Sequence, residues 1–310
     1  MADRARSQSP PRFTLPAGIS PDRFAELVRL AREEDLGEAG DVTTRLAGLA
    51  GEAQADIVAR QPGLFCGAEL LPALLAALAP EVTVASGPSC PALQVAAGQG
   101  VARLAGPVRQ LLEAERTLLN FLQRLSGVAT LTRRFVEAVA GTAARVYDTR
   151  KTVPGWRDLD KYAVRCGGGH NHRHGLHDAV LVKDNHLAGV PTERLAYVLF
   201  EMLNGLQQLE AAPEFVEVEV DNLAQLGELL KVVGINVVLL DNFSPAQLRQ
   251  AVQVRDAAGL KSKVELEASG GVTLENVRAI AETGVERISV GAITHSPPAF
   301  NLALELLPNR

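Results

Sequence analysis

The feature that most constrains the fold is a repeat that begins near Arg145, in which short apolar runs alternate with helical patterns. Six runs predict strands, at 146–148, 179–182, 216–220, 237–240, 264–268 and 288–290. Helical patterns lie between several of them, at 193–209, 223–233, 245–258 and 274–283. Continuous apolar strands separated by helices are typical of a parallel sheet with both faces covered, and this number of units suits a (β/α) barrel. We expect a further strand near 162–165.

The N-terminal part has a different pattern. Ser20 followed by Pro21 predicts the start of a helix, after a polar stretch at 1–18 that predicts a disordered lead. Residues 53–104 combine short apolar runs with Gly and Pro turns and one helical stretch at 68–78, which is typical of a small α+β layer. Long helices are expected over 107–139, so a domain boundary is predicted near 106–113.

Size and charge narrow the class of protein. The 310 residues are enough for one large or two medium domains, and the 47% hydrophobic content is that of a globular protein. A net charge of −5 gives no general attraction to nucleic acid or to an anionic membrane. The three cysteines form no CxxC pair, no secretory signal is visible, and no apolar run could span a bilayer, so we expect a reducing cytoplasm.

Charged or glycine-rich residues follow every predicted strand. They are found at 148–151, 183–185, 219–221, 241–242, 269–271 and 291–292. In a (β/α) barrel these positions share one rim, where barrel enzymes build their active sites. One site on that rim explains the six positions better than six separate coincidences do.

A basic cluster lies between residues 148 and 186. The stretch holds a Gly triplet, five of the six histidines of the chain and seven cationic side chains, namely Arg150, Lys151, Arg157, Lys161, Arg165, Arg173 and Lys183. Because the protein as a whole is acidic, this local excess of positive charge predicts a small anionic ligand.

The last two turns of the repeat predict phosphate binding. Ser269, Gly270 and Gly271 follow one late strand, and Val290, Gly291 and Ala292 follow the next. Backbone N–H groups in a glycine-rich turn ahead of a helix bind phosphate, because the missing side chains allow close approach and the helix end adds positive potential.

Two carboxylates, Glu219 and Asp241, end neighbouring predicted strands. Such a pair can hold Mg²⁺ directly or through water, while phosphate oxygens complete the coordination shell. The alternative is a structural role, as a helix N-cap or in a salt bridge with a lysine of the rim. Cations and carboxylates on one rim suit a substrate that carries both a diphosphate and a metal.

The histidines leave a zinc site open as an alternative. His170, His172, His174 and His177 lie close in sequence, but their spacing matches neither HExxH nor a Cys/His finger. Imidazoles beside Arg173 are more consistent with an anion site.

The motifs, taken together and in order, resemble the quinolinate phosphoribosyltransferase family of NAD synthesis. The resemblance covers nearly the whole chain, from EEDLGEAGDVTT through ERTLLNFLQRLSGVAT, DTRKTVPGWR, GGGHNHRHGLHD, VLVKDNH, EVEVDN, LLDNF and LEASGG to SVGAITHS. Asp221 stands where the family frequently has Glu, a change that should not matter.

The resemblance implies an α/β fold with an N-terminal α/β sandwich domain at 19–112. An incomplete seven-stranded (β/α) barrel follows at 113–292, and a C-terminal tail at 293–310 packs back on the first domain. It also implies a homodimer with shared active sites, in which Arg116 reaches the quinolinate site of the partner subunit.

The implied reaction transfers a phosphoribosyl group from phosphoribosyl pyrophosphate to quinolinate with loss of CO₂, with Mg²⁺ as cofactor. Lys151, Glu219 and Asp241 are the expected catalytic residues. Quinolinate is expected at Arg116, Thr149, Arg150, Lys151, His172, Arg173 and Lys183. Phosphoribosyl pyrophosphate is expected at Lys151, Glu219, Asp241, Ser269, Gly270, Gly271, Val290, Gly291, Ala292 and His295, with the metal at Glu219 and Asp241.

Three other functions stay open on the residues alone. The first is a related pyrophosphorylase-like enzyme with another acceptor, such as the molybdenum-locus relatives of the family. The second is a zinc-dependent barrel hydrolase built on the histidines. The third is a non-catalytic phosphate-binding protein, which would not need the acid pair beside the basic set.

Overall fold

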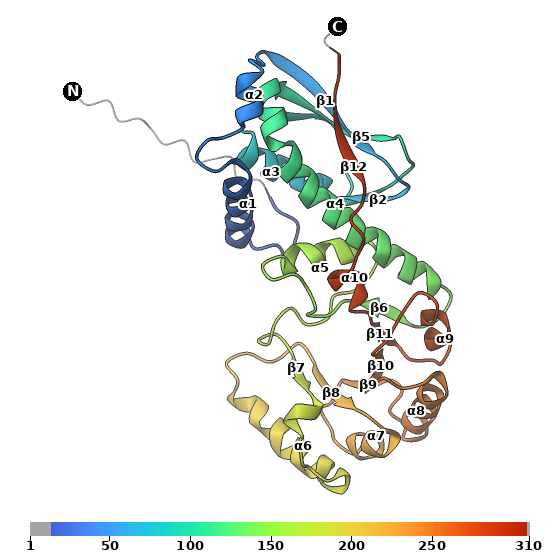
Figure 1. Ribbon diagram of the computed structural model, residues 1–310. Helices are drawn as coiled ribbons and strands as arrows, with labels where there is room; N and C mark the ends of the chain where they lie inside the picture. The colour runs from blue at the N-terminus through green and yellow to red at the C-terminus, as the bar shows by residue number, and fades with distance from the viewer. Residues whose placement is uncertain (1–13, 309–310) are drawn as a thin grey trace, which may run out of the picture. The chain divides into compact units, whose positions relative to one another are not determined.

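The computed structural model describes residues 14–308, and the chain divides into two compact units (Figure 1). Of these residues, the first unit contains 14–123 together with 300–308, and the second contains 124–299. The long helix α4 (Val108–Ala138) begins in the first unit, which therefore extends beyond the boundary expected at 112. The predicted lead at 1–18 lies mostly outside the described residues.

The first unit is built on an antiparallel sheet with the strand order β12-β1-β5-β3. Its strands are β1 (Glu52–Ala59), β3 (Thr83–Ser86), β5 (Gly100–Pro107) and β12 (Leu302–Leu306), and a separate pair joins β2 (Gly63–Cys66) to β4 (Ala92–Val95). The helices are α1 (Pro21–Leu36), α2 (Val42–Leu46) and α3 (Leu71–Leu78), with a 3₁₀ turn η1 (Ala68–Leu70) ahead of α3. The Ser20 side chain accepts a hydrogen bond from the Arg23 backbone N, so it caps α1 as predicted.

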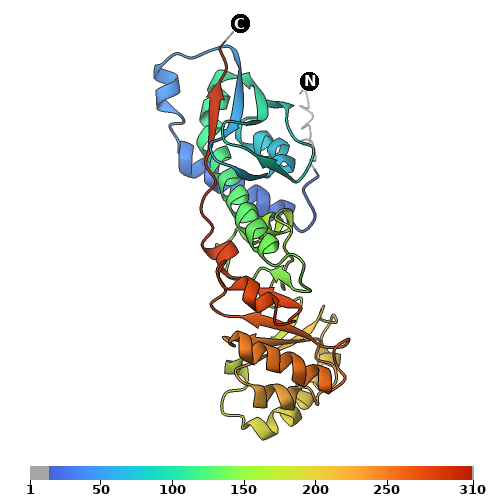
Figure 2. The same cartoon turned by 90° about the vertical axis from the view of Figure 1, so that its right-hand side faces the viewer.

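Strand β12 comes from the end of the chain and pairs with β1, from Ala55↔Leu306 to Ala59↔Leu302 (Figure 2). Its approach is held by Gln123, whose backbone O accepts from Phe300 N at 2.9 Å and whose side chain donates to Leu302 O at 3.0 Å. The pattern of apolar runs predicted neither β2 nor β12, because both are short and β12 lies far in sequence from its partner strand.

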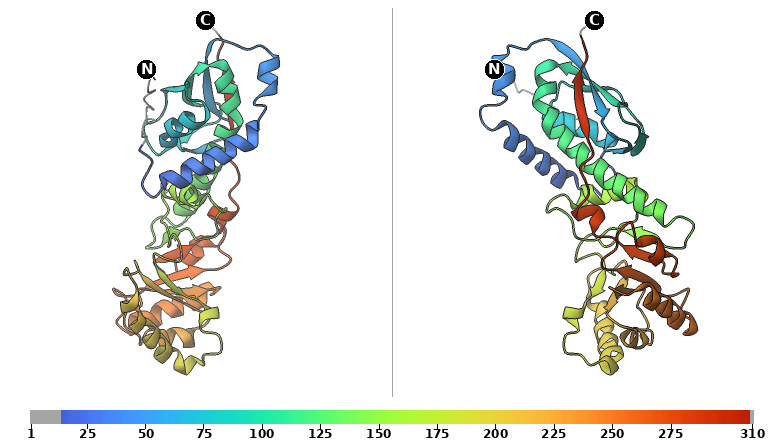
Figure 3. Two further views of the ribbon diagram at one scale, coloured as in Figure 1. Left: turned by 90° about the vertical axis from the view of Figure 1, so that its left-hand side faces the viewer. Right: turned by 45° about the vertical axis from the view of Figure 1, so that its right-hand side comes forward.

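The second unit contains a parallel sheet with the order β6-β11-β10-β9-β8-β7. The strands are β6 (Arg145–Tyr147), β7 (Val180–Val182), β8 (Val216–Val220), β9 (Val237–Asp241), β10 (Glu265–Ser269) and β11 (Arg287–Ser289). Helices α6 (Leu195–Asn204), α7 (Leu223–Leu229), α8 (Pro245–Ala257) and α9 (Val277–Ala281) connect the later strands, and neighbouring helices pack on one another (Figure 3). The α/β class and all six predicted strands are confirmed.

Short helical turns complete the second unit. Around α6, the stretch expected as one helix over 193–209 divides into η3 (Thr192–Arg194), α6 and η4 (Gly205–Gln208). Two more turns follow strands directly: η2 (Asp184–His186) after β7 and α10 (Ala292–His295) after β11. These two turns lie where the sequence predicted parts of the functional site.

The expected strand at 162–165 is wrong, because these residues belong to helix α5 (Arg157–Cys166). Tyr162, Ala163 and Val164 form an apolar run too short for its periodicity to distinguish a strand from a buried helix. The place beside β6 is instead taken by a single parallel bridge between Tyr147 and His170, whose N donates to Val146 O at 2.8 Å. Strand pairing among the described residues is that of an open sheet, and closure into a barrel stays a prediction.

Candidate functional site

The parallel sheet brings the ends of its strands to one edge. Ser269 is paired with Asp241, and Ser289 with Tyr147. Read in the order of the sheet, the residues at or just after the strand ends are Lys151, Gly291, Gly270, Asp241, Glu219 and Lys183. The predicted cations, glycine turns and carboxylates therefore lie in one row, which we call the rim.

The glycine turn after β10 meets the end of β9 closely. Asn242 has a φ of 56°, and its backbone N donates to Ser269 O at 2.9 Å. Gly270 has a φ of +90°, and a Cβ there would collide with Asn242 Oδ1. Both conditions require glycine. The Asn242 side chain donates to Asp241 Oδ2 at 2.7 Å, so the turn also orients the predicted metal ligand.

The turn after β11 contacts the loop that carries Lys151. A Cβ on Gly291 would lie 3.0 Å from Lys151 Cδ and 3.2 Å from His295 Cδ2. Thr294 Oγ1 donates to Lys151 O at 2.9 Å, and Lys151 N donates to Thr149 Oγ1 at 3.0 Å. Lys151, Gly291 and His295 are thus brought together, as predicted for a phosphate site. Within residues 14–308, no carboxylate pairs with the exposed Lys151.

At the other end of the rim, Lys183 forms an ion pair with Glu219. Glu219 is 9% exposed on its side chain and Lys183 is 45% exposed. The salt bridge that was the alternative to a metal role for Glu219 is therefore present in the structure. A lysine that is nearly half exposed can turn away from its partner at small cost, because such ion pairs are weak.

A buried network fixes the segment 170–173 against the end of β6. Asp148 Oδ1 accepts from Lys161 Nζ at 2.5 Å and from His172 N at 2.8 Å, while Oδ2 accepts from Asn171 Nδ2 at 2.6 Å. Lys161 Nζ also donates to His172 O at 2.8 Å. Burial raises the pKa of Asp148 and lowers that of Lys161, and each charge opposes the shift of the other.

Three of the seven cations expected to attract an anion are occupied by structural partners. Lys161 is 1% exposed and bound to Asp148. Arg157 donates to His174 O at 3.1 Å and to Thr152 Oγ1 at 3.2 Å, and Arg165 donates to Asn171 Oδ1 at 2.5 Å. The cations left for a ligand are Arg150, Lys151, Arg173 and Lys183.

Arg173 is 7% exposed, and its Nη1 donates to Ala179 O at 3.2 Å. Burial lowers the pKa of Arg173, and the charge of Arg150 lowers it further. Two guanidinium groups near enough to repel each other indicate a place for an anion. Arg173 also lines a cavity of about 590 Å³, together with His177, Val180 and His186. A larger cavity of about 830 Å³ in the first unit, between Glu52 and Pro308, is lined by no predicted site residue.

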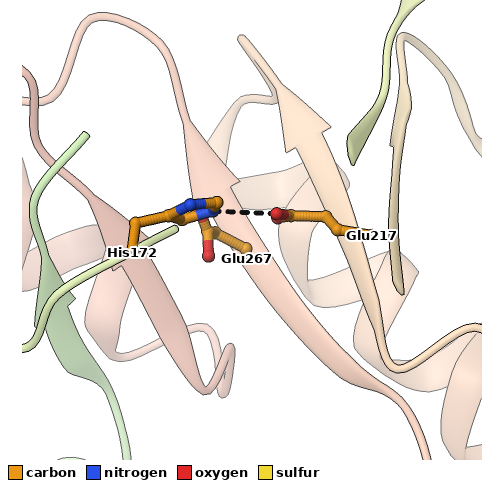
Figure 4. A group of neighbouring side chains, drawn as sticks. All are labelled: His172, Glu217 and Glu267. Atoms are coloured by element: carbon orange, nitrogen blue, oxygen red, sulfur yellow. Dashed lines mark ion pairs between the residues drawn. The ribbon is translucent and has the colours of Figure 1, made fainter. Parts of the chain in front are cut away.

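The predicted residue His172 lies in a second polar group, buried beneath the rim, whose other members Glu217, Glu267 and Arg287 sequence reasoning missed. Figure 4 shows His172 with the two glutamates. His172 Nε2 lies 2.8 Å from Glu217 Oε2 and 3.5 Å from Glu267 Oε1, and Arg287 Nε lies 2.7 Å from Glu267 Oε2. Among the described residues the carboxylate oxygens and Arg287 Nε make no hydrogen bond of normal geometry, and the contact between Arg287 and Glu267 is an ion pair. We call this group the interior cluster.

Burial dominates the electrostatics of the interior cluster. It raises the pKa of both Glu217 and Glu267 to about 7, and the attraction of Arg287 opposes the shift in each. Burial also lowers the pKa of His172. The signal that could have found the cluster is the alternation in VEVEV and ELEAS, where a Glu recurs on the face expected to be apolar.

The four clustered histidines do not gather into one metal site. His170 lies against Tyr147, with ring centroids 5.3 Å apart, and His174 Nε2 contacts Asp158 Oδ1 at 2.8 Å. In the described part of the chain, the one group of three side chains able to hold a metal is His172 with Glu217 and Glu267. The zinc alternative based on the histidine spacing therefore gains no support.

Arg116 lies in the first unit, on the exposed side of α4. In the described part of the chain, no disulfide involves Cys66, Cys90 or Cys166.

Comparison with known proteins identifies the family. Residues 41–126 match "Quinolinate phosphoribosyl transferase, N-terminal domain", and residues 128–305 match "Quinolinate phosphoribosyl transferase, C-terminal domain". The chain belongs to the quinolinate phosphoribosyltransferase family. The resemblance inferred from the ordered motifs is therefore confirmed.

Relatives of quinolinate phosphoribosyltransferase type align over almost the full chain. "Nicotinate-nucleotide pyrophosphorylase [carboxylating]" of Mycobacterium leprae is 41% identical, over 92% of this chain and 98% of the relative. The probable enzyme of the same name from Bacillus subtilis is 36% identical, over 88% and 90%. The solved nicotinate-nucleotide pyrophosphorylase of Francisella tularensis is 36% identical with a TM-score of 0.82, over 95% of this chain and 100% of that one. Among the described residues, no helix is both long and apolar enough to cross a membrane.

Proposed function

We propose that this chain transfers the phosphoribosyl group of phosphoribosyl pyrophosphate to quinolinate, with loss of CO₂, to give nicotinate mononucleotide and diphosphate. The observation that carries the proposal is the rim, which aligns Lys151, two glycine turns, Asp241, Glu219 and Lys183 along one sheet edge. Relatives named as carboxylating nicotinate-nucleotide pyrophosphorylases and as decarboxylating quinolinate phosphoribosyltransferases support the same reaction.

The quinolinate subsite consists of cations that lack a carboxylate partner or can release one. Arg150 and Arg173 are near each other, and Lys183 can leave Glu219 for a ligand carboxylate. Guanidinium groups bind carboxylates with two parallel N–H···O bonds, which also fixes the plane of the pyridine ring. A dianion would relieve the repulsion between the two arginines.

The phosphoribosyl pyrophosphate subsite lies along the middle of the rim. The turns at 269–271 and 290–292 offer backbone N–H groups to phosphate oxygens, and Lys151 beside Gly291 offers a positive charge to the leaving diphosphate. Glu219 and Asp241 are oxygen donors on neighbouring strands, which fits the preference of Mg²⁺ for carboxylate and phosphate oxygens. Mg²⁺ held there would help to neutralise the diphosphate.

The chemistry follows from this placement. The pyridine nitrogen attacks ribose C1 while the bond from C1 to the diphosphate oxygen breaks, and positive charge develops on the ribose. Lys151 stabilises the departing diphosphate, and binding both substrates on one edge supplies proximity. In the resulting nucleotide the ring nitrogen is cationic, so its charge stabilises the electron pair that stays on the adjacent ring carbon when the 2-carboxylate leaves as CO₂. A proton from water then takes the place of CO₂ at that carbon, and no dedicated base is needed.

We also propose that the protein is a homodimer in which Arg116 of the partner subunit completes the quinolinate subsite. The exposed position of Arg116 on α4 is compatible with this role. Mixed dimers of Arg116→Ala and Lys151→Ala chains should recover activity, because one of their two sites would be intact. Activity no higher than that of the parent variants in verified mixed dimers would contradict shared sites.

The decisive experiment incubates the protein with quinolinate, phosphoribosyl pyrophosphate and Mg²⁺ and follows CO₂ and nicotinate mononucleotide. Both products should form in equal amounts. Nicotinate is the matched control, because it keeps the ring nitrogen and lacks the 2-carboxylate, and it should not be a substrate. Turnover of nicotinate, or absence of CO₂ with quinolinate, would contradict the proposal.

A further inference from the structure

The backbone of His172 is held on both sides by the buried network at the end of β6. Its N–H donates to Asp148 Oδ1 at 2.8 Å, and its carbonyl accepts from Lys161 Nζ at 2.8 Å. Asp148 is 0% exposed and Lys161 1% exposed, so neither can exchange these bonds for water without opening the interior. The peptide groups on both sides of His172 are therefore fixed.

Both nitrogens of the His172 ring are engaged as well. Nδ1 accepts a hydrogen bond from the backbone N of Arg173 at 2.8 Å. Burial lowers the pKa of His172, so the ring is neutral near pH 7 and carries one proton. Because Nδ1 is an acceptor, that proton is on Nε2, which faces Glu217 and Glu267 (Figure 4).

This arrangement favours a proton over a metal ion between the three side chains. A metal on Nε2 of a neutral ring would require the proton on Nδ1, where it would point at the N–H of Arg173. Arg287 already supplies a positive charge, with Nε 2.7 Å from Glu267 Oε2. A cation in the same place would be repelled by Arg287.

Aromatic packing fixes the same group. The Arg287 guanidinium carbon lies 4.1 Å from the centroid of the Tyr147 ring and 5.2 Å from that of Phe215. Phe215 meets the His172 ring edge to face, with centroids 5.4 Å apart. The imidazole is therefore held in one orientation by packing as well as by its polar contacts.

We propose that His172 is a positioning residue, which fixes the backbone of Arg173 so that its guanidinium meets the quinolinate carboxylate, and that Glu267 and Arg287 act through His172. The proposal rests on the proposed function. His172 was expected to contact quinolinate itself. Both of its ring nitrogens contact protein groups, so in this proposal Arg173 makes the direct contact with quinolinate. Sequence spacing gave no reason to connect Glu267 or Arg287 with substrate binding.

A double-mutant cycle with His172→Ala and Glu267→Gln tests the connection. If Glu267 acts through His172, each single variant should raise the KM for quinolinate roughly 10- to 100-fold, and the double variant no more than the worse single one. The KM for phosphoribosyl pyrophosphate should stay unchanged. Glu282→Gln is the control, at the exposed end of α9 and paired with Arg278, and it should leave both KM values unchanged. If the fold-increases in quinolinate KM of the two single variants multiply in the double variant, the proposal is overturned.

Two conservative variants separate the ring nitrogens. His172→Asn keeps an acceptor at the place of Nδ1, and His172→Gln keeps a polar atom at the place of Nε2. Positioning through Arg173 N predicts that Asn lowers the quinolinate KM about tenfold relative to His172→Ala, whereas Gln does not. The opposite order would mean that Nε2 contacts the substrate directly. Thermal unfolding of each variant shows whether it is folded before its KM is compared.

Nitrogen NMR of the histidine-labelled protein provides a readout independent of turnover. Nε2 of His172 should be protonated and Nδ1 unprotonated in the free protein, and addition of quinolinate should leave this pattern unchanged. An unprotonated Nε2 would overturn the inference. Failure of the proposed function would instead appear as a wild-type protein without turnover that still shows the expected tautomer.

Discussion

The rim and the interior cluster use the same kinds of side chain in opposite ways. On the rim, Lys151 and Asp241 keep charge accessible to a ligand, and Lys183 is nearly half exposed even while paired with Glu219. In the interior, Asp148 is buried against Lys161 and Glu267 against Arg287, while Glu217 is buried against the neutral ring of His172. Charged side chains of the rim can therefore exchange their partners for substrate groups, whereas those of the interior keep the same protein partners.

The difference teaches that position relative to the strand end decides the role of a charged residue in this sheet. Glu219 is at the edge and Glu217 lies two residues earlier on the same face, beneath it. Desolvation of a charge is costly, so a buried residue such as Glu217 needs a permanent polar partner in the protein. A residue at the edge, such as Glu219, can exchange its partner for a ligand.

The largest expected effect is a loss of stability when a buried charge of the interior loses its partner. Lys161→Met should lower the free energy of unfolding by about 3–5 kcal/mol, because it leaves Asp148 buried without its counter-ion. Urea denaturation measures the change. Arg165→Met, an exposed position on the same helix, is the control and should cost less than about 1 kcal/mol. Equal losses in the two variants would mean that burial does not distinguish these cations.

The rim side predicts a loss of rate without a loss of stability. Lys151→Ala should lower kcat about 100- to 1000-fold, because the leaving diphosphate loses its charge partner. The free energy of unfolding should change by less than about 0.5 kcal/mol, since Lys151 is exposed and no carboxylate of residues 14–308 pairs with it. Steady-state kinetics and urea denaturation on one preparation test both statements. A large stability loss with normal turnover would place Lys151 with the interior residues.

The interior cluster predicts a pH dependence of stability. The pKa of Glu267 is raised to about 7 from an ordinary value of 4.5, so the folded state binds this proton more tightly than the unfolded state. The stabilisation is complete below pH 4.5 and is lost as the pH rises through 7, by up to about 3 kcal/mol. Glu267→Gln has no such proton to lose, so the variant should gain stability relative to wild type across this window.

Urea denaturation of both proteins at several pH values measures the difference. A constant difference between wild type and Glu267→Gln at all pH values would contradict the raised pKa.

The smallest expected effect concerns metal use on the rim. Asp241→Asn should raise the Mg²⁺ concentration needed for half-maximal turnover about tenfold, because it removes one charged oxygen ligand. Asp221→Asn is the control, since Asp221 is exposed just beyond β8 and has no proposed metal role. An identical Mg²⁺ dependence in wild type and Asp241→Asn would remove Asp241 from the metal site.

Much of the fold could be predicted from periodicity. The six parallel strands and the helices between them follow from continuous apolar runs that alternate with helical patterns. The strand placed at 162–165 was wrong because a short apolar run fits a buried helix equally well. Strand β12 was not predicted from pattern because its partner β1 lies at the other end of the chain, and pairing at that distance leaves no local signal.

The sequence by itself determined where the rim lies, because strand ends in a parallel sheet share one edge and the charged and glycine residues stand at those ends. Only the tertiary structure decided which charges remain available to a ligand. Lys151 and Lys161 look alike in the sequence, yet one is exposed beside Gly291 and the other is buried against Asp148. The reason is that neutralisation of a charge depends on the register of strands and helices far apart in the chain, which local patterns do not record.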